Sequence, residues 1–397
     1  MKFIYLIIII LLLPSIIILK AIDGKGTKDD PYQITTINEF QNIIDQKKNI
    51  YYILMNDIDA SETRNWNVGD HDGNPNTPDE PMGFIPIIYF MGNLDGQGHV
   101  ISNLYINIQQ GFGNIGLFAC FGLGGYIRRL GIENCDITGF GNVGSLCGYC
   151  ENGLITECYT TGSVNSIDTN SNNTVGGFCG VNNRSPIENC YTSCTTSSLS
   201  TKSDYIVAGF CHASRLPFVD VVYCYSIGKI TSSKKIYIFS ELENARYCFW
   251  DVETTGIPDT GGNEAKGLPT SEMKKKATYS IWDFDRVWCI DEGKDYPKLR
   301  AFGKCPPTDV PQEPKEIENK IEVLPNPATD KITIEFPSEF MSNARVSIFS
   351  CLGIELLTQN TFNKRFEFDC FPLPNGIYFC VVKSGSKAYS GKFVVVK

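Results

Sequence analysis

The sequence predicts an all-β protein: a parallel β-helix, a solenoid of stacked coils, followed by a small C-terminal β-sandwich. A repeat between residues 113 and 251 has the period of solenoid proteins. Only 20% of the 397 residues are charged, and Gly, Asn, Ser and Thr are abundant, which is typical of extracellular β proteins. After residue 321, apolar and polar residues alternate between turn signals, as in a sandwich.

Two columns of cysteines make the repeat visible. The first column lies in Gly-rich segments, and its successive cysteines are 27, 32 and 32 residues apart. In the second column most cysteines follow an Ile/Val-x-x pattern, and the separations are 23, 32, 34 and 24 residues. The columns are Cys120, Cys147, Cys179 and Cys211, and Cys135, Cys158, Cys190, Cys224 and Cys248. No window has helical spacing, and the unit is too short for a propeller blade of ~40–50 residues. Each repeat is therefore expected to form one coil, with glycines at corners of positive φ and side chains of successive coils stacked ~4.8 Å apart.

Residues 1–21 have the pattern of an export signal. Lys2 supplies the positive end, residues 3–19 are almost entirely apolar, and Ala21 offers a cleavage position. The apolar run is long for such a signal, so an uncleaved membrane anchor is the alternative. The β-helix with its caps is expected over residues 22–302, a Pro-rich linker over 303–320, and the sandwich over 321–397.

The β-helix is expected to be closed at both ends. Thr36 and Glu39 fit a capping box that opens a helix ending near Gln46, which would plug the first coil. At the other end, a short helix over residues 270–277 and an aromatic closing cap over residues 282–297 are expected.

An insertion at residues 69–81 carries alternating Asp and Asn residues. Their oxygens suit a hard cation such as Ca²⁺, the one cofactor that the sequence suggests. The candidate ligands are Asp70, Asp72, Asn74, Asn76 and Asp79. Pro75 and Pro81 stand where an EF-hand loop has Gly and Glu, so a solvated acidic loop is the alternative.

The cysteines admit three interpretations. They can be small buried hydrophobic residues, because a free cysteine packs like one. They can form disulfides, because stacked Cα atoms ~4.8 Å apart fall inside the disulfide range, although in-register parallel pairs make the geometry awkward. Cys147 and Cys150 form a C-x-x-C, and His212 follows Cys211, so a metal or redox site is the third.

An aromatic column follows the second set of cysteines. Tyr159, Tyr191, Tyr225 and Phe249 occupy equivalent places in successive repeats. If the rings point inward they are core, and if they point outward they form a platform for sugar faces or a partner.

Residues 24–300 resemble GLUG-repeat proteins. The similarity is carried by the opening Gly-x-Gly-Thr-x-x-x-Pro-Tyr-Gln-Ile at residues 24–34, by Leu-Asp-Gly-Gln-Gly-His at residues 94–99, and by repeats such as residues 175–191. The resemblance implies a surface-exposed right-handed β-helix, as in adhesin-like proteins and non-catalytic parts of some secreted proteases. The cysteines depart from the family, which usually has small or aliphatic residues there.

Residues 321–397 resemble the C-terminal sorting domain of the type IX secretion system. The matching segments are residues 323–330, residues 373–378 and the terminal Lys-Phe-Val-Val-Val-Lys. The resemblance implies export across the inner membrane by the signal peptide, passage of the outer membrane by the type IX machinery, and removal of the domain. The protein would then be tethered to a surface glycolipid or released.

A catalytic site is not expected. Glu133, Glu157 and Glu188 occupy one repeat column, which is typical of a solvated face, and the three histidines lie in no catalytic motif. The net charge of −9 argues against nucleic acid as a partner. We therefore expect a non-catalytic, adhesin-like protein on the outer cell surface that binds a glycan or another host or cell-surface ligand. The alternative is a carbohydrate-active β-helix enzyme, a polysaccharide lyase or glycoside hydrolase.

Overall fold

The computed structural model describes most of the chain, and the expected export signal lies outside the described residues. The described ranges are 22–44, 46–69, 79–110, 113–168, 173–200, 205–213, 221–232, 235–239, 245–259, 265–306, 321–336, 344–350, 355–361, 365–384 and 387–397. The chain divides into two compact units, Met1–Pro306 and Pro307–Lys397. Among the described helices, none has the length and apolar character needed to cross a membrane.

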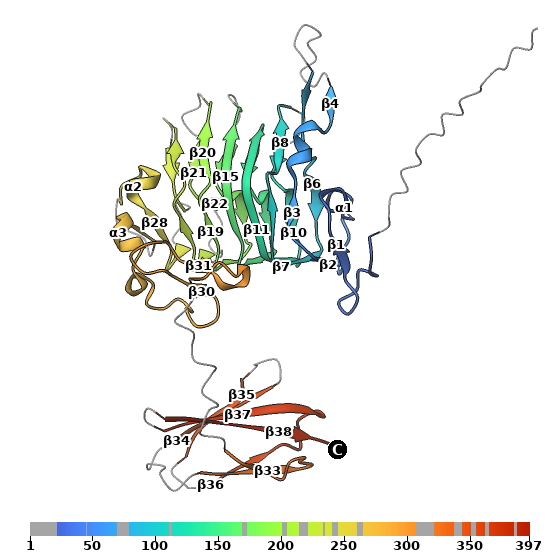
Figure 1. The fold of residues 1–397 in the computed structure, drawn as a ribbon, viewed down its shortest axis with the longest axis vertical. Coiled ribbons are helices and arrows are strands. Elements are labelled where there is room, and N and C mark those ends of the chain that lie inside the picture. Colours follow the sequence, from blue (N-terminus) through green and yellow to red (C-terminus); the bar gives the residue numbers. More distant parts are fainter. Residues whose placement is uncertain are drawn as a thin grey trace, which may run out of the picture. The chain divides into compact units, whose positions relative to one another are not determined.

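The first unit is a parallel β-helix, as predicted, with three parallel sheets wrapped around one core (Figure 1). The largest sheet comprises β1 (Tyr32–Ile34), β2 (Tyr51–Leu54), β3 (Ile58–Asp59), β7 (Asn93–Ser102), β8 (Tyr105–Ile108), β11 (Tyr126–Gly139), β14 (Leu154–Thr156), β15 (Tyr159–Ser166), β18 (Ile187–Glu188), β19 (Tyr191–Thr192), β20 (Thr195–Ser198), β23 (Val221–Val222), β24 (Tyr225–Ser226), β25 (Ile230–Thr231), β27 (Ala245–Arg246), β28 (Phe249–Asp251) and β29 (Lys266–Leu268). The second comprises β6 (Ile87–Phe90), β10 (Phe118–Gly122), β13 (Cys147–Glu151), β17 (Cys179–Asn183) and β22 (Cys211–Ala213). The third comprises β9 (Asn114–Ile115), β12 (Asn142–Gly144), β16 (Thr174–Gly176), β21 (Ile206–Ala208) and β26 (Lys235–Tyr237).

Residues of like kind stack along the core in ladders. One ladder joins equivalent residues of successive coils through parallel pairing: Leu94, Ile127, Ile155, Ile187, Val221 and Ala245. All six are buried in a single hydrophobic cluster. Because each coil contributes one layer of this cluster, the core is continuous along the β-helix.

In both predicted cysteine columns, the first cysteine does not occupy the position of the later ones. Phe118, not Cys120, pairs with Cys147, so Cys120 lies two residues further along the strand. Leu130 stands three residues after Ile127, as Cys158 does after Ile155, whereas Cys135 pairs with Gly162. In the earlier coils, Phe118 and Leu130 therefore occupy the positions that cysteines occupy in the later coils. This agrees with the interpretation that the cysteines of the later coils are core residues.

The main corner of the coils is not made by glycine, contrary to expectation. Its residues stack at φ between 51° and 58°: Arg129, Glu157, Asn189, Tyr223 and Tyr247. The backbone N–H groups of Glu157, Asn189 and Tyr223 donate across coils, as from Glu157 to the Glu188 carbonyl at 3.1 Å. These inter-coil bonds compensate for the cost of the left-handed conformation, which is of order 1–3 kcal/mol for a residue other than glycine.

The N-terminal end of the β-helix is covered by α1 (Ile37–Gln41), shorter than the expected helix. The capping box of Thr36 and Glu39 is confirmed. Ile37 and Phe40 are buried, and the Phe40 ring lies 6.0 Å from that of Phe118 inside the first coils. The plug thus joins the apolar core itself.

The remaining elements of the first unit lie beside or beyond the coils. The hairpin of β4 (Val68–Gly69) and β5 (Glu80–Pro81) is antiparallel. Beyond β28 come α2 (Val252–Thr255) and α3 (Thr270–Met273), the latter within the predicted short helix. The others are η1 (Ser61–Asn65), η2 (Lys276–Tyr279), β30 (Trp288–Cys289), β31 (Lys298–Leu299) and η3 (Arg300–Phe302).

The second unit is a small antiparallel sandwich, as predicted. One sheet is β32 (Val323–Leu324), β33 (Lys331–Glu335) and β36 (Arg365–Asp369). The other is β35 (Glu355–Thr361), β34 (Ala344–Ser350), β37 (Gly376–Ser384) and β38 (Lys387–Val395). The two inner faces bury a core that includes Ile332, Val346 and Phe393. The sequence suggested strands near β33, β34, β37 and β38 and missed β32, which has two residues, β35, which has little alternation, and β36, although its residues alternate between polar and apolar.

Candidate functional site

The aromatic column points away from the β-helix core, yet Tyr159 and Tyr225 are buried and Tyr191 and Phe249 are partly buried. Cys158 and Thr160 face the core, so Tyr159 between them faces out. The rings of Tyr159 and Tyr191 stack at 4.9 Å, and those of Tyr191 and Tyr225 at 4.7 Å. A second hydrophobic cluster covers them. The rings point outward, as the second of the two alternatives predicted, but the column is not an open platform for a ligand.

The cover is a strap, defined here as residues 279–304, that runs back along the coils. Tyr279 packs on Phe249 of the last coil, with ring centroids 5.1 Å apart. Trp282, Trp288 and Phe302 then pack on Tyr225, Tyr191 and Tyr159 at 6.3, 6.2 and 4.6 Å. The expected closing cap is therefore a lateral cover of the aromatic column rather than a plug alone.

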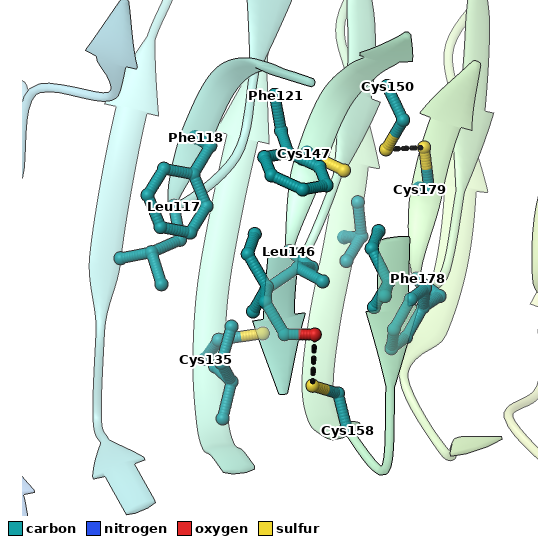
Figure 2. Close-up of a cluster of buried hydrophobic side chains, with 14 of the residues drawn as sticks. Leu117, Phe118, Phe121, Cys135, Leu146, Cys147, Cys150, Cys158, Phe178 and Cys179 are labelled. Carbon is teal, nitrogen blue, oxygen red and sulfur yellow. Dashed lines mark hydrogen bonds between the residues drawn. The ribbon is translucent and has the colours of Figure 1, made fainter. Parts of the chain in front are cut away.

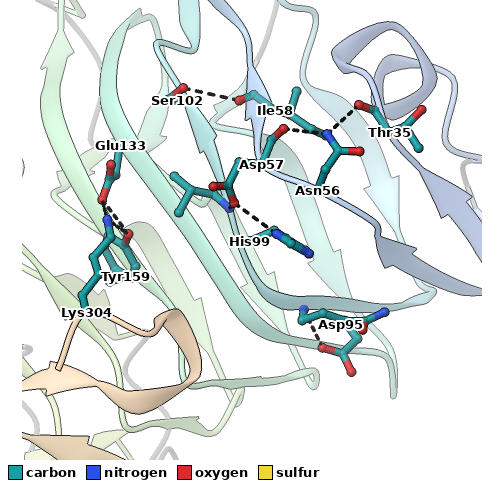
Figure 3. A network of polar contacts seen from close by, with 12 residues as sticks. Thr35, Asn56, Asp57, Ile58, Asp95, His99, Ser102, Glu133, Tyr159 and Lys304 are labelled. Carbon is teal, nitrogen blue, oxygen red and sulfur yellow. Dashed lines mark hydrogen bonds and ion pairs between the residues drawn. The ribbon is translucent and has the colours of Figure 1, made fainter. Parts of the chain in front are cut away.

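A polar tie fastens the far end of the strap (Figure 3). Lys304 forms an ion pair with Glu133, and the Tyr159 hydroxyl donates to Glu133 at 2.6 Å. Burial alone would raise the pKa of Glu133, but the hydrogen bonds from Lys304 and Tyr159 outweigh it and hold that pKa below its usual value. Burial and the Glu133 charge raise the pKa of Tyr159 far above its usual value, so this hydroxyl stays a donor.

The three glutamates of the predicted acidic column do not share a ladder. Glu133 pairs with Ser102, Glu188 pairs with Thr156, and Glu157 lies at the corner. The expectation of a single repeated acidic column was wrong: Glu157 stands two residues after Ile155, whereas Glu188 stands one residue after Ile187, the partner of Ile155. Burial raises the pKa of Glu157, with the nearby Arg129 acting against it.

Two further charged groups lie on the same side of the molecule (Figure 3). The Asp95 carboxylate is almost completely buried and is held by Arg128, whose Nη2 lies at 2.9 Å, and by Arg129. Burial would raise the pKa of Asp95, but the bonds from Arg129 and the backbone of Gln97 lower it. The Nδ1 atom of His99 lies 3.1 Å from Asp57. Each of these carboxylates thus has a cationic or basic side chain beside it.

The outer face of the second sheet carries a ladder of partly exposed residues. Its residues are Tyr89, Cys120, Tyr149, Val181 and His212, each partly exposed. Beside it, the Asn183 amide donates to the Tyr149 hydroxyl at 2.8 Å and to Glu151 at 3.1 Å. We call these residues the tyrosine face. Aromatic rings beside amide and carboxylate groups offer both stacking surface and hydrogen bonds.

Three thiols meet inside the core (Figure 2), on β13 and β17, the strands that also carry Tyr149 and Val181 of the tyrosine face. The sulfur atoms of Cys147, Cys150 and Cys179 all lie within 4.8 Å of one another, and that of Cys150 is 3.2 Å from that of Cys179. Burial raises the pKa of Cys150 and Cys179 well above the usual thiol value. It acts in the same direction on Cys147, but hydrogen bonds from the other two sulfurs outweigh it and lower the pKa of Cys147 to about 6.

Most described cysteines are free and buried. The disulfide that the structure contains joins Cys289 to Cys305 and fastens the strap. The sequence had placed Cys305 in the linker, and no repeat pattern pointed to this pair. His212 and Cys211 lie on adjacent positions of β22, and His212 belongs to the outer ladder rather than to the thiol group.

The calcium prediction stays a prediction. Asp70, Asp72, Asn74 and Asn76 lie outside the described residues. Asp79 is described, is exposed, and directly precedes β5 of the hairpin that brackets the insertion.

Comparisons with known proteins identify the second unit and say less about the first. Residues 322–396 match the family described as the secretion system C-terminal sorting domain. Part of the chain is 36% identical over 143 residues to halomucin of Haloquadratum walsbyi, which is 35% of this chain. The chain spans about 1% of the length of that relative. The crystal structure of a "putative immunoglobulin A1 protease" from Bacteroides ovatus is similar over 70% of this chain and 94% of its own, with 16% identity and a TM-score of 0.44.

The described strands of the second unit fall within the matched range and form the two sheets of the sandwich. The match coincides with the segment whose motifs resemble sorting domains. Residues 322–396 are therefore a C-terminal sorting domain of the type IX secretion system, and the protein is one that is secreted or displayed on the cell surface.

Proposed function

We propose that this protein is an adhesin-like, non-catalytic binding protein with GLUG-type repeats, exported by its signal peptide and the type IX machinery and held at the outer cell surface. The sorting domain is the observation that carries the proposal. A β-helix suits this role, because its continuous core gives a rigid scaffold, and the outer face of its second sheet has partly exposed side chains to offer to ligands.

The tyrosine face is the surface that we assign to ligand binding. The aromatic column is covered by the strap, whereas Tyr89 and Tyr149 are partly exposed on the second sheet. A ring can stack on the apolar face of a sugar, while Asn183 and Glu151 are placed to bond its hydroxyls. A cell-surface or host glycan is therefore the expected ligand, and a surface glycolipid is the expected anchor.

Two experiments test the proposal. Deletion of residues 322–396 in the native cell should leave the protein in the periplasm, and its normal appearance on the surface would contradict the export route. Tyr149→Ala should weaken binding of the mature protein on a glycan array by roughly tenfold, about 1.4 kcal/mol. Tyr247→Ala, which removes an exposed ring at the corner, serves as the matched control. Equal binding by both variants and the unchanged protein would contradict the assigned face.

A carbohydrate-active enzyme is the second candidate, favoured by the charged groups around Glu133. Glu133, Lys304, Asp57 and His99 bring acids and bases to one side of the β-helix. Cleavage of a polysaccharide by the mature protein that is lost in Glu133→Gln would establish this activity in place of the non-catalytic role. Absence of cleavage across acidic and neutral polysaccharides supports the binding role.

A further inference from the structure

The C-x-x-C of β13 places both of its cysteines in the core. Cys147 and Cys150 are three residues apart, a spacing that in a regular strand would put them on opposite faces. Both are nevertheless fully buried, while Tyr149 between them is partly exposed. Cys179 pairs with Cys147 from the next coil, so its sulfur joins theirs. Three sulfurs from two neighbouring coils thus converge on one point (Figure 2).

We propose that Cys147, Cys150 and Cys179 form a buried site for one thiophilic cation, and that Cu(I) is the ion it takes. Sulfurs bound at ~2.3 Å around a central ion in one plane lie about 4.0 Å apart, with the distance taken from thiolate–zinc bonds. The three sulfurs here are within 4.8 Å of one another, so small side-chain movements suffice to admit an ion.

The number of donors favours Cu(I) over Zn(II). Structural zinc almost always has four ligands, whereas soft thiolates also select Cu(I), which is satisfied by fewer. Among the described residues, no fourth histidine, cysteine or carboxylate joins this group. The surroundings, which include Phe121, Leu146 and Phe178, are apolar and exclude water, and this protects Cu(I) from oxidation.

The second cysteine ladder shows that buried cysteines alone do not make such a site. Cys158, Cys190, Cys224 and Cys248 follow one another with one sulfur per coil, and they form no group of three within the same range among the described residues. The difference is the second cysteine of the C-x-x-C, which adds a sulfur within one coil. Cys224 is therefore a matched control, equally buried and free.

Binding at this site is coupled to folding and to protons. The sulfurs are inaccessible in the folded chain, so the ion must enter while β13 and β17 are still apart. Each thiol that binds as a thiolate releases one proton, three in all from the fully protonated group, and no electron is transferred. Uptake should therefore weaken as the pH falls.

The test is to refold the full chain without oxygen in the presence of Cu(I), supplied as its acetonitrile complex. A copper chelator is then added to remove copper that is not held inside the protein. We expect one retained copper per chain, bound to three sulfurs by X-ray absorption. Cys150→Ala should lose it, and Cys224→Ala should keep it. Zinc retained in place of copper in a parallel refolding, equal loss in both variants, or a Cys150–Cys179 disulfide in protein recovered from cells would each overturn the proposal.

Discussion

At the scale of single residues, Gly98 shows how the strap constrains a coil. Its φ is +83°, and a Cβ added there would lie 1.9 Å from the Ala301 carbonyl oxygen of the strap. Gly124 has a similar φ of +96° with nothing near its missing Cβ. The two glycines therefore separate the cost of the backbone conformation from the cost of close approach.

We expect Gly98→Ala to destabilise the protein more than Gly124→Ala. The left-handed conformation costs both variants about 1–2 kcal/mol, and the clash with the strap adds roughly 1–3 kcal/mol for Gly98→Ala. Urea unfolding followed by tryptophan fluorescence measures both, because Trp282 and Trp288 lie in the strap cluster. Equal losses would show that the strap does not press on this coil.

The tie at Glu133 should make strap attachment depend on pH. The folded pKa of Glu133 is lowered, so its contribution is present above the usual glutamate pKa and disappears as the pH falls through the lowered value. Glu133→Gln should cost about 0.5–1 kcal/mol at pH 7 and almost nothing in strong acid. The double variant with Lys304→Met should cost less than the sum of the single variants. A difference that is independent of pH would contradict the tie.

At the scale of elements, the strap decides which aromatic surface is exposed. Its tryptophans cover the outward tyrosine column, and the Cys289–Cys305 disulfide closes the segment that ends at Lys304. Without this element the column would be the large exposed aromatic stripe that a repeat of tyrosines suggests.

Removing the disulfide should loosen the strap. Cys289→Ala/Cys305→Ala opens a loop of sequence separation 16, and closure of a loop of that length is worth about 3 kcal/mol. We expect faster proteolysis between residues 279 and 304 and a red-shifted tryptophan emission. Cys380→Ala, which removes a buried free thiol of the sandwich, is the control. Unchanged proteolysis would show that aromatic packing alone holds the strap.

At the scale of the whole molecule, the two units have separate hydrophobic cores. Separate cores in one chain usually unfold as separate cooperative units. The sorting domain is thus able to serve as an export address without taking part in the stability of the β-helix.

Calorimetry of the full chain should therefore show two transitions. A chain that ends at residue 306 should keep the midpoint of the β-helix transition, because its core, strap and disulfide are all retained. A lowered midpoint would mean that the sandwich stabilises the β-helix.

The sequence by itself determined the fold class, the capping box of Thr36 and Glu39 and the sorting domain, because local patterns of spacing and turn residues carry each of them. It did not determine which residues begin the two cysteine ladders, because Phe118 and Leu130 occupy those positions in place of cysteine. The packing of the strap along the aromatic column, the Cys289–Cys305 disulfide and the burial of Cys150 beside Cys147 and Cys179 were decided by tertiary structure alone. They depend on contacts between segments far apart in the sequence and on a departure from strand alternation between Cys147 and Cys150, and no local pattern encodes either.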